Sequence, residues 1–118
     1  MSAEFELLRH MNVDIGDKES VGDVDYFKKL LAPTFAMRRS NGVFNNRDEF
    51  LAGVTTSPQR ETENPSVTLY SDTCAVVWCM VSTTASGEVN RVHNLRVFTR
   101  ADAAAEWQLM AWSNTRIP

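Results

Sequence analysis

The chain has 118 residues, of which 43% are hydrophobic and 23% are charged, and its net charge is −3 at pH 7. This length and balance are typical of one globular domain that buries about two-thirds of its unfolded surface. The negative net charge and the scattered basic residues exclude a global electrostatic footprint for nucleic acid or an anionic membrane. We therefore expect a single domain over residues 1–118 that binds neither nucleic acid nor membrane.

The N-terminus and the two cysteines indicate a soluble, cytoplasmic protein. The chain opens without the basic start and apolar block of a signal peptide, and its longest apolar stretch is far too short for a membrane span. Cys74 and Cys79 lie in one expected strand at a separation of about 16 Å, which no disulfide can bridge. We expect both to be free thiols in a reducing compartment, and their spacing offers no zinc site.

The first part of the chain is predicted to be helical. From Ala3 the apolar residues recur at steps of three and four, which predicts an amphipathic helix punctuated at Gly16-Asp17 and at Gly22-Asp23. A second, short helix is predicted to start at a cap on Asp23 or Asp25. It should end near Pro33, because the residue before a proline resists the α conformation.

A strand, a turn and a third helix are predicted next. Residues 34–39 alternate between the two faces in the manner of a strand. Residues 40–42 read Ser-Asn-Gly, which is a turn signal, and a short return strand is expected after them. The third helix is predicted over residues 47–55, with Asn45 or Asn46 at its start.

Four strands are predicted in the second half. The first, over residues 61–70, contains Pro65, which favours an edge position or a bulge. The second, over residues 73–84, is apolar and β-branched on both faces, as expected of a central strand. Ser86-Gly87 is a two-residue hairpin signal, and a long hairpin over residues 89–117 closes the chain.

The two hairpins predict which side chains share a face of the sheet. If Thr84 pairs with Val89 and Thr99 pairs with Trp107, two sets result. We expect the inner set to consist of Trp78, Met80, His93, Leu95, Val97, Trp107, Leu109 and Ser113. We expect the outer set to consist of Asn94, Arg96, Phe98, Met110 and Trp112. A slip of one residue in either hairpin would move its set to the other face.

Three groups of residues, taken in this order, carry a family resemblance. They are Leu30-Leu-Ala-Pro-Thr-Phe35 with Arg47-Asp-Glu-Phe-Leu-Ala52, then Tyr70-Ser-Asp-Thr-Cys-Ala-Val-Val77, and finally Arg96-Val-Phe-Thr-Arg100 with Trp107-Gln-Leu-Met-Ala-Trp112. Together with the order of the elements, they resemble the nuclear-transport-factor-2-like superfamily, and within it the SnoaL-like and DUF4440-type domains. The resemblance spans nearly the whole chain.

The resemblance implies an α+β fold. Its core would be a cone-shaped, curved, mixed or antiparallel β-sheet with about three N-terminal helices packed on the concave face. It also implies a hydrophobic pocket inside the cone and a homodimer through the outer sheet face. Members include ketosteroid isomerases, polyketide cyclases, epoxide hydrolases, dehydratases and binding domains, so the fold does not determine the function.

The inner face is predicted to line a pocket for an unknown small apolar or mildly polar molecule, with no cofactor and no metal. The predicted pocket residues are Tyr26, Trp78, Met80, His93, Leu95, Trp107 and Ser113. The outer face would leave a large apolar patch on a monomer, and such patches usually mark interfaces. The predicted homodimer interface consists of Arg96, Phe98, Met110 and Trp112.

His93 is the candidate catalytic residue, because a histidine side chain exchanges protons near neutral pH. In one reading it is the general acid/base of a lyase, isomerase or cyclase, assisted by Ser113 or Glu63. In a second reading it is a core histidine bonded to one of these residues, in a domain that binds a ligand without catalysis. A third reading is a non-catalytic dimerisation module whose cone is filled by its own side chains. Arg39 and Arg91 either steer an anionic ligand to the cone or are simply solvated.

Overall fold

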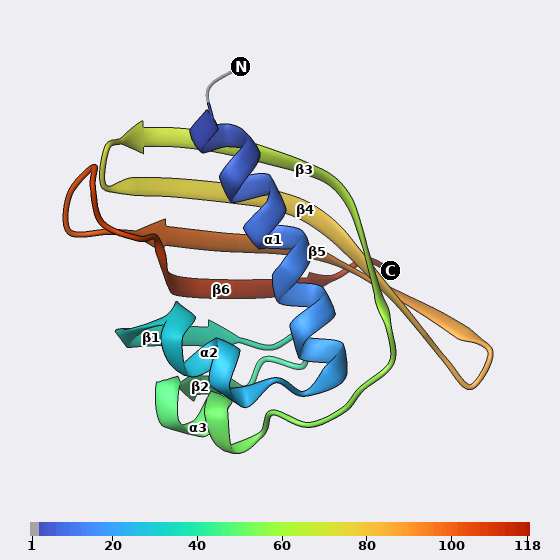
Figure 1. Cartoon of the computed structure of the whole chain (residues 1–118). Helices are drawn as coiled ribbons and strands as arrows, with labels where there is room; N and C mark the ends of the chain where they lie inside the picture. The colour runs from blue at the N-terminus through green and yellow to red at the C-terminus, as the bar shows by residue number, and fades with distance from the viewer. Residues whose placement is uncertain (1–2) are drawn as a thin grey trace.

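In the computed structural model, which describes residues 3–118, three helices cover one face of a six-stranded sheet (Figure 1). The elements are α1 Ala3–Val21, α2 Val24–Leu30, β1 Leu31–Arg38, β2 Phe44–Asn46, α3 Arg47–Ala52, β3 Arg60–Ser71, β4 Cys74–Ala85, β5 Glu88–Thr99 and β6 Gln108–Arg116. The strand order is β2-β1-β6-β5-β4-β3, in which β1 and β6 run parallel and the other neighbours are antiparallel. The predicted α+β fold with a mixed, curved sheet is confirmed.

Helix α1 runs without a break up to the second predicted punctuation, at Gly22-Asp23. The predicted break at Gly16 is wrong, since the helix continues to Val21 and crosses the strands obliquely (Figure 1). Its buried residues include Leu8, Asn12 and Ile15, which recur at three- and four-residue steps and face the sheet. Burial of this face outweighs the cost of about 1 kcal/mol that a glycine brings to a helix interior.

Capping residues set the starts of the two short helices, as predicted. The Asp23 side chain accepts a hydrogen bond from the Tyr26 backbone N–H at 3.1 Å and begins α2. Asn46 and Glu49 form a reciprocal capping box at 2.9 Å on α3. Helix α3 ends at Ala52, three residues before its predicted end.

The β4–β5 hairpin has the predicted register. Thr84 pairs with Val89, and Met80 pairs with His93. Ser86 has a φ of 53° and the glycine after it has a φ of 79°, which is the backbone geometry of the favoured two-residue hairpin turn. Strand β3 is at the edge of the sheet, and its register shifts around Pro65, so that prediction is confirmed as well.

The β5–β6 pairing differs from the prediction by one residue at the loop and by one more at a bulge in β6. Thr99 pairs with Gln108 and not with Trp107. The register then shifts between Val97 and Phe98, which leaves Met110 as the extra residue of β6. Leu109 consequently pairs with Phe98 and belongs to the buried face, together with its neighbour Trp107.

The two faces of the sheet are reversed relative to the prediction for most of the assigned residues, whereas Trp107 and Leu109 are buried on the inner face as predicted. Arg96, Phe98 and Trp112, predicted to be on the outer face, are buried under the helices. Trp78 is 53% exposed and His93 is also exposed, so the predicted pocket face is the outer one. Both faces of the predicted sheet carry apolar residues, so the sequence pattern did not decide which face is buried. The charge of Arg96 favoured a position in solvent for its side chain. The burial of Arg96 is tolerable because Asn12 of α1 accepts hydrogen bonds from its guanidinium.

The core fills the space between the helices and the inner sheet face. It contains a chain of aromatic rings in which Phe50 contacts Phe27, Phe35 and Trp112, with ring centroids 5.2–5.7 Å apart. Tyr26 extends this chain by an edge contact with Phe27. Among the helices of residues 3–118, none combines the length and the hydrophobicity that a membrane span requires.

Candidate functional site

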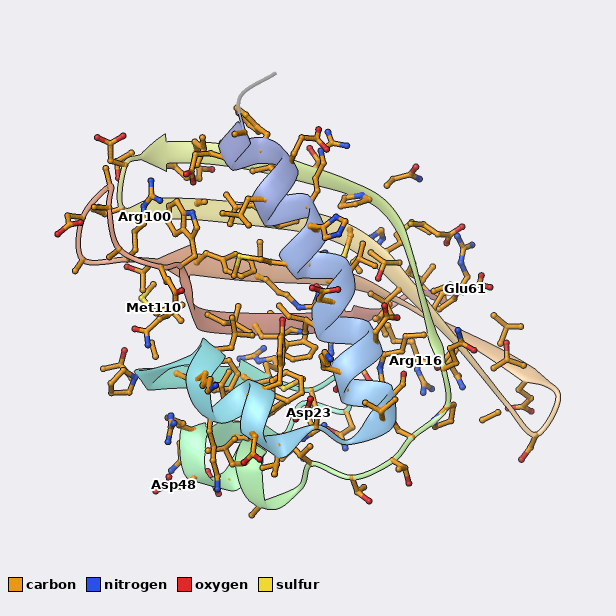
Figure 2. All side chains as sticks on the ribbon, in the orientation of Figure 1. Asp23, Asp48, Glu61, Arg100, Met110 and Arg116 are labelled. Carbon is orange, nitrogen blue, oxygen red and sulfur yellow. The ribbon has the colours of Figure 1, made fainter. Side chains whose placement is uncertain are left out.

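A polar cleft of about 340 Å³ lies between the C-terminal part of α1 and one end of the inner sheet face. Four arginines line it, namely Arg39, Arg60, Arg96 and Arg116. Figure 2 shows Arg116 and Arg100 at opposite ends of the sheet, so the cleft occupies the end far from the β5–β6 loop. An excess of arginines in a concave surface attracts anions.

Arg96 lies at the base of this cleft and is 1% exposed. Its Nη1 donates to the backbone oxygen of Asn12 at 3.0 Å and to Oδ1 of the same residue at 2.9 Å. Its guanidinium stacks on Trp112, 4.1 Å from the ring centroid. Burial lowers the pKa of Arg96 to about 10, which still leaves the side chain protonated at neutral pH.

The Arg96 charge has no bonded counter-ion among residues 3–118. Its Nε is buried without a hydrogen-bond partner, and no carboxylate of the described residues forms an ion pair with it. Both hydrogens of Nη1 are used by Asn12, so the free donors are on the Nε side of the guanidinium. An arginine with one free edge can bind an oxoanion through parallel hydrogen bonds.

A relay of amides and one thiol connects α1 to the last strand. Asn12 Nδ2 donates to Cys79 Sγ at 3.2 Å, and the Cys79 thiol donates to Asn94 Oδ1 at 3.6 Å. Burial raises the pKa of Cys79, which keeps the thiol protonated as that donor. Asn114 Oδ1 then accepts from Asn94 Nδ2 at 2.7 Å and from Trp112 Nε1 at 3.1 Å. The Asn114 NH₂ is left as a donor with no hydrogen-bond partner in residues 3–118.

Glu19 is the single carboxylate among the described residues that line the cleft. Its Oε1 lies 3.0 Å from Arg60 Nε, and its side chain is 14% exposed. Burial raises the pKa of Glu19, and the nearby charges of Arg60, Arg96 and Arg39 oppose that rise. Arg60 is further held by Ser57, whose Oγ accepts from its Nη1 at 2.7 Å.

The remaining two arginines are closer to solvent. Arg39 is half-buried, donates to Asn45 Oδ1 at 2.6 Å and lies 5.9 Å from the centroid of the Phe50 ring. Arg116 is exposed at the end of β6. The positive charges therefore extend from the interior at Arg96 to the surface at Arg116, which favours the entry of an anion.

The predicted pocket residues are divided between two other places. Trp78, Met80, His93, Leu95 and Ser113 line one groove of about 390 Å³ on the outer sheet face. Tyr26 and Trp107 line a separate groove of about 700 Å³ between α1, α2 and the β5–β6 loop. Burial raises the pKa of the Tyr26 phenol to about 12. The seven residues thus do not form one pocket inside the cone.

The two predicted assistants of His93 have different positions. Ser113 lines the same groove, whereas Glu63 Oε2 lies 3.3 Å from Arg91 Nη2 in an exposed ion pair. The structure gives the imidazole no hydrogen bond within residues 3–118. The core-histidine reading is wrong because His93 is exposed. Its role as an acid/base stays a prediction.

The predicted dimer-interface residues are also divided. Arg96, Phe98 and Trp112 are interior residues of the folded chain and are not available to a partner. Met110, at the β6 bulge, is 36% exposed. Trp78, a large apolar side chain predicted to lie in the pocket, is exposed on the outer sheet face instead.

No sequence motif marks the residues of the cleft. Asn12 and Glu19 are on one helix face, but each meets its arginine only through tertiary packing. One pattern could have indicated the cleft. Asn94, Arg96 and Phe98 share one face of β5, so hydrogen-bond donors lie on the same face as a buried aromatic ring. Within residues 3–118, no three His, Cys, Asp or Glu side chains are grouped in a way that could hold a metal ion.

Solved structures with the same architecture cover nearly the whole chain. A putative Ca/calmodulin-dependent kinase II association domain from Exiguobacterium sibiricum matches with a TM-score of 0.80 and 16% identity, covering 100% of this chain and 96% of that one. An NTF2-like protein from Cytophaga hutchinsonii matches with a TM-score of 0.79 and 15% identity, covering 99% and 100%. The CaMKII hub of S. rosetta matches with a TM-score of 0.78 and 17% identity, covering 99% of each chain.

No protein-family model matches the chain, and no curated protein matches it. The narrower SnoaL-like and DUF4440-type assignment therefore stays a prediction. The structural matches have low sequence identity and high coverage, which is evidence about the fold alone. The chain has the nuclear-transport-factor-2-like fold.

Proposed function

We propose that the chain binds a small anionic molecule, of the size of a short carboxylate, in the arginine-lined cleft. The observation that carries this proposal is the buried Arg96 guanidinium with an unpartnered Nε and no bonded carboxylate. A buried charge without a paired counter-ion is costly, and a bound anion would supply that counter-ion. The ligand class differs from the apolar or mildly polar molecule predicted from the sequence, because the residues that line this cleft are mainly polar.

The size and donors of the cleft support a small oxoanion. Its volume of about 340 Å³ is near the lower end of the range for ligand pockets. The free donors are the Nε side of Arg96 and the NH₂ of Asn114, and a carboxylate only accepts hydrogen bonds. Trp112 covers one face of the guanidinium, which leaves the guanidinium edge as the route for an in-plane, bidentate contact.

Calorimetric titration with sodium succinate at constant ionic strength tests this proposal. Arg39→Gln and Arg116→Gln should each weaken binding by about tenfold, because each removes one cation from the cleft. The matched control is Arg91→Gln, which removes an arginine from the outer sheet face and should leave the affinity unchanged. Binding that is equally weak in all three variants and in the wild type, or no binding at all, would overturn the proposal.

A second candidate function is self-association through the outer sheet face. Trp78 is 53% exposed on that face and lines an apolar groove with Met80 and Leu95. Two of the solved structures with this fold are named as a kinase association domain and a kinase hub. We propose that the chain forms at least a homodimer, with the outer sheet face as the contact.

Sedimentation equilibrium tests self-association. Trp78→Lys should give a monomer, because it puts a charge at the centre of the proposed contact. The control is Val43→Lys, which adds the same charge at an exposed apolar residue in the turn before β2. A wild-type protein that is monomeric at all concentrations contradicts the proposal.

We also propose a cellular location and, as an alternative function, an enzymatic activity. A cytoplasmic, reducing location is supported by the free thiols of Cys74 and Cys79. A lyase, isomerase or cyclase activity would require His93 to act in the outer groove. That groove offers Ser113 as a hydroxyl neighbour, so loss of an activity in His93→Gln and not in Ser113→Ala would assign the proton transfer to the histidine.

A further inference from the structure

We propose that Glu19 acts as a built-in counter-anion of the cleft and determines which anions the arginines accept. The inference deepens the proposed anion binding and rests on it. In the unliganded protein Glu19 would neutralise part of the arginine charge, and an incoming anion would compete with it. Glu19 would thereby be a specificity-determining residue of the site.

The position of Glu19 supports this role. Its carboxylate lies 3.0 Å from Arg60, and it lines both the main cleft and a neighbouring cavity of about 120 Å³. Arg39 and Arg60 also line both cavities. No other carboxylate belongs to the described lining of either cavity. Any anion that enters therefore meets cations whose local carboxylate, among the lining residues that the structure describes, is Glu19 alone.

The charges around Glu19 come from three different strands. Arg60 begins β3, Arg39 follows β1, and Arg96 projects from β5, and all three act on the Glu19 carboxylate. On α1 itself, the adjacent Lys18 is engaged with Asp23 at 3.8 Å. Glu19 thus faces three cations and, among residues 3–118, no other carboxylate of the cleft lining, so its ionised form depends on the field of these cations.

An added anion changes that balance in a predictable direction. Like charges at short range disfavour ionisation, so a bound carboxylate favours the protonated form of Glu19. Burial already raises the pKa of Glu19, so burial and a bound anion both favour its protonated form. Anion binding should therefore take up a proton, and the affinity should rise as the pH falls. The effect should be larger for a dianion than for a monoanion.

The test is calorimetric titration with sodium acetate and with sodium succinate, each in two buffers that differ in ionisation enthalpy. The wild type should take up a fraction of a proton per anion bound. Glu19→Gln should remove this uptake and should bind succinate about tenfold more tightly, with a smaller gain for acetate. The matched control is Glu63→Gln, which neutralises a glutamate that pairs with Arg91 on the outer face and should change neither quantity.

The outcomes separate this inference from the anion-binding proposal. If neither the wild type nor Glu19→Gln binds either probe, anion binding itself is wrong. If the wild type binds without proton uptake and Glu19→Gln has the same affinity, the cleft binds anions but the role of Glu19 is overturned. Proton uptake by the wild type alone remains decisive if Glu19→Gln fails to fold, because no other carboxylate of the described residues lines the cleft.

Discussion

The guanidinium of Arg96 lies 4.1 Å from the centre of the Trp112 ring, and both side chains are almost fully buried. The two residues come from neighbouring strands and are paired in the sheet register. Asn12 of α1 closes the arrangement by accepting two hydrogen bonds from the same guanidinium. One cation is thus fixed against an aromatic face and a helix, and its residue lines the cleft.

The Asn12–Arg96 contact should be energetically coupled. Asn12→Leu removes one acceptor from a buried charge and should lower the free energy of unfolding by about 2 kcal/mol. Arg96→Met should cost a similar amount, since it leaves the Asn12 acceptors unpaired. The double variant should lose less than the sum of the two single losses. Urea denaturation measures all four proteins, and strictly additive losses would show that the contact contributes nothing.

Glu19 should make stability depend on pH in a particular direction. Burial raises its pKa above the ordinary value of 4.5, so the folded state holds a proton that the unfolded state has released. The native protein therefore loses stability as the pH rises from about 4.5 through the folded pKa. Glu19→Gln should lack this slope. The check is the difference in unfolding free energy between the two proteins across this pH range, and a constant difference would refute it.

Two glycines should respond oppositely to alanine. At Gly16 an added Cβ would lie 3.6 Å from Thr62 Oγ1, which is ordinary contact, so Gly16→Ala should stabilise α1 by about 0.5–1 kcal/mol. At Gly22 the φ is +71° and the added Cβ would lie 2.8 Å from the Thr55 backbone carbon. Gly22→Ala should therefore destabilise by more than about 1 kcal/mol. Thermal melts compare the two variants, and equal shifts would contradict the geometry.

His93 should contribute little to the stability of the folded chain. It is exposed on the outer face, and the described residues give its ring no hydrogen bond. His93→Gln should change the free energy of unfolding by less than about 0.5 kcal/mol. Chemical denaturation at low protein concentration isolates this effect from any association. A loss of several times that size would mean that His93 is in a packed environment.

Local signals predicted a large part of the fold. Asp23 and Asn46 marked helix starts because capping depends on a side chain and a backbone group three residues away. The β4–β5 register followed from Ser86-Gly87, since a two-residue turn leaves one pairing. Both features are decided within a few residues, where sequence patterns are informative.

The errors came from interactions between distant residues. The bulge at Met110 has no marker in the sequence, and it places Leu109 on the same face as Trp112, whereas the prediction had put these two residues on opposite faces. The burial of Arg96 depends on Asn12, which lies 84 positions earlier in the chain. A charged residue on a strand is ordinarily assigned to solvent, and only the helix that covers it reverses that choice.

The most direct measurement of anion binding is the NMR signal of the Arg96 Nε–H during titration with sodium succinate at constant ionic strength. We predict that this signal and the signal of the Trp112 indole N–H both change in a saturable way. We predict no such change in the signal of the Arg91 side chain. Signals of Arg96 and Trp112 that do not change, or that change only as much as that of Arg91, would contradict the proposal that this cleft binds anions.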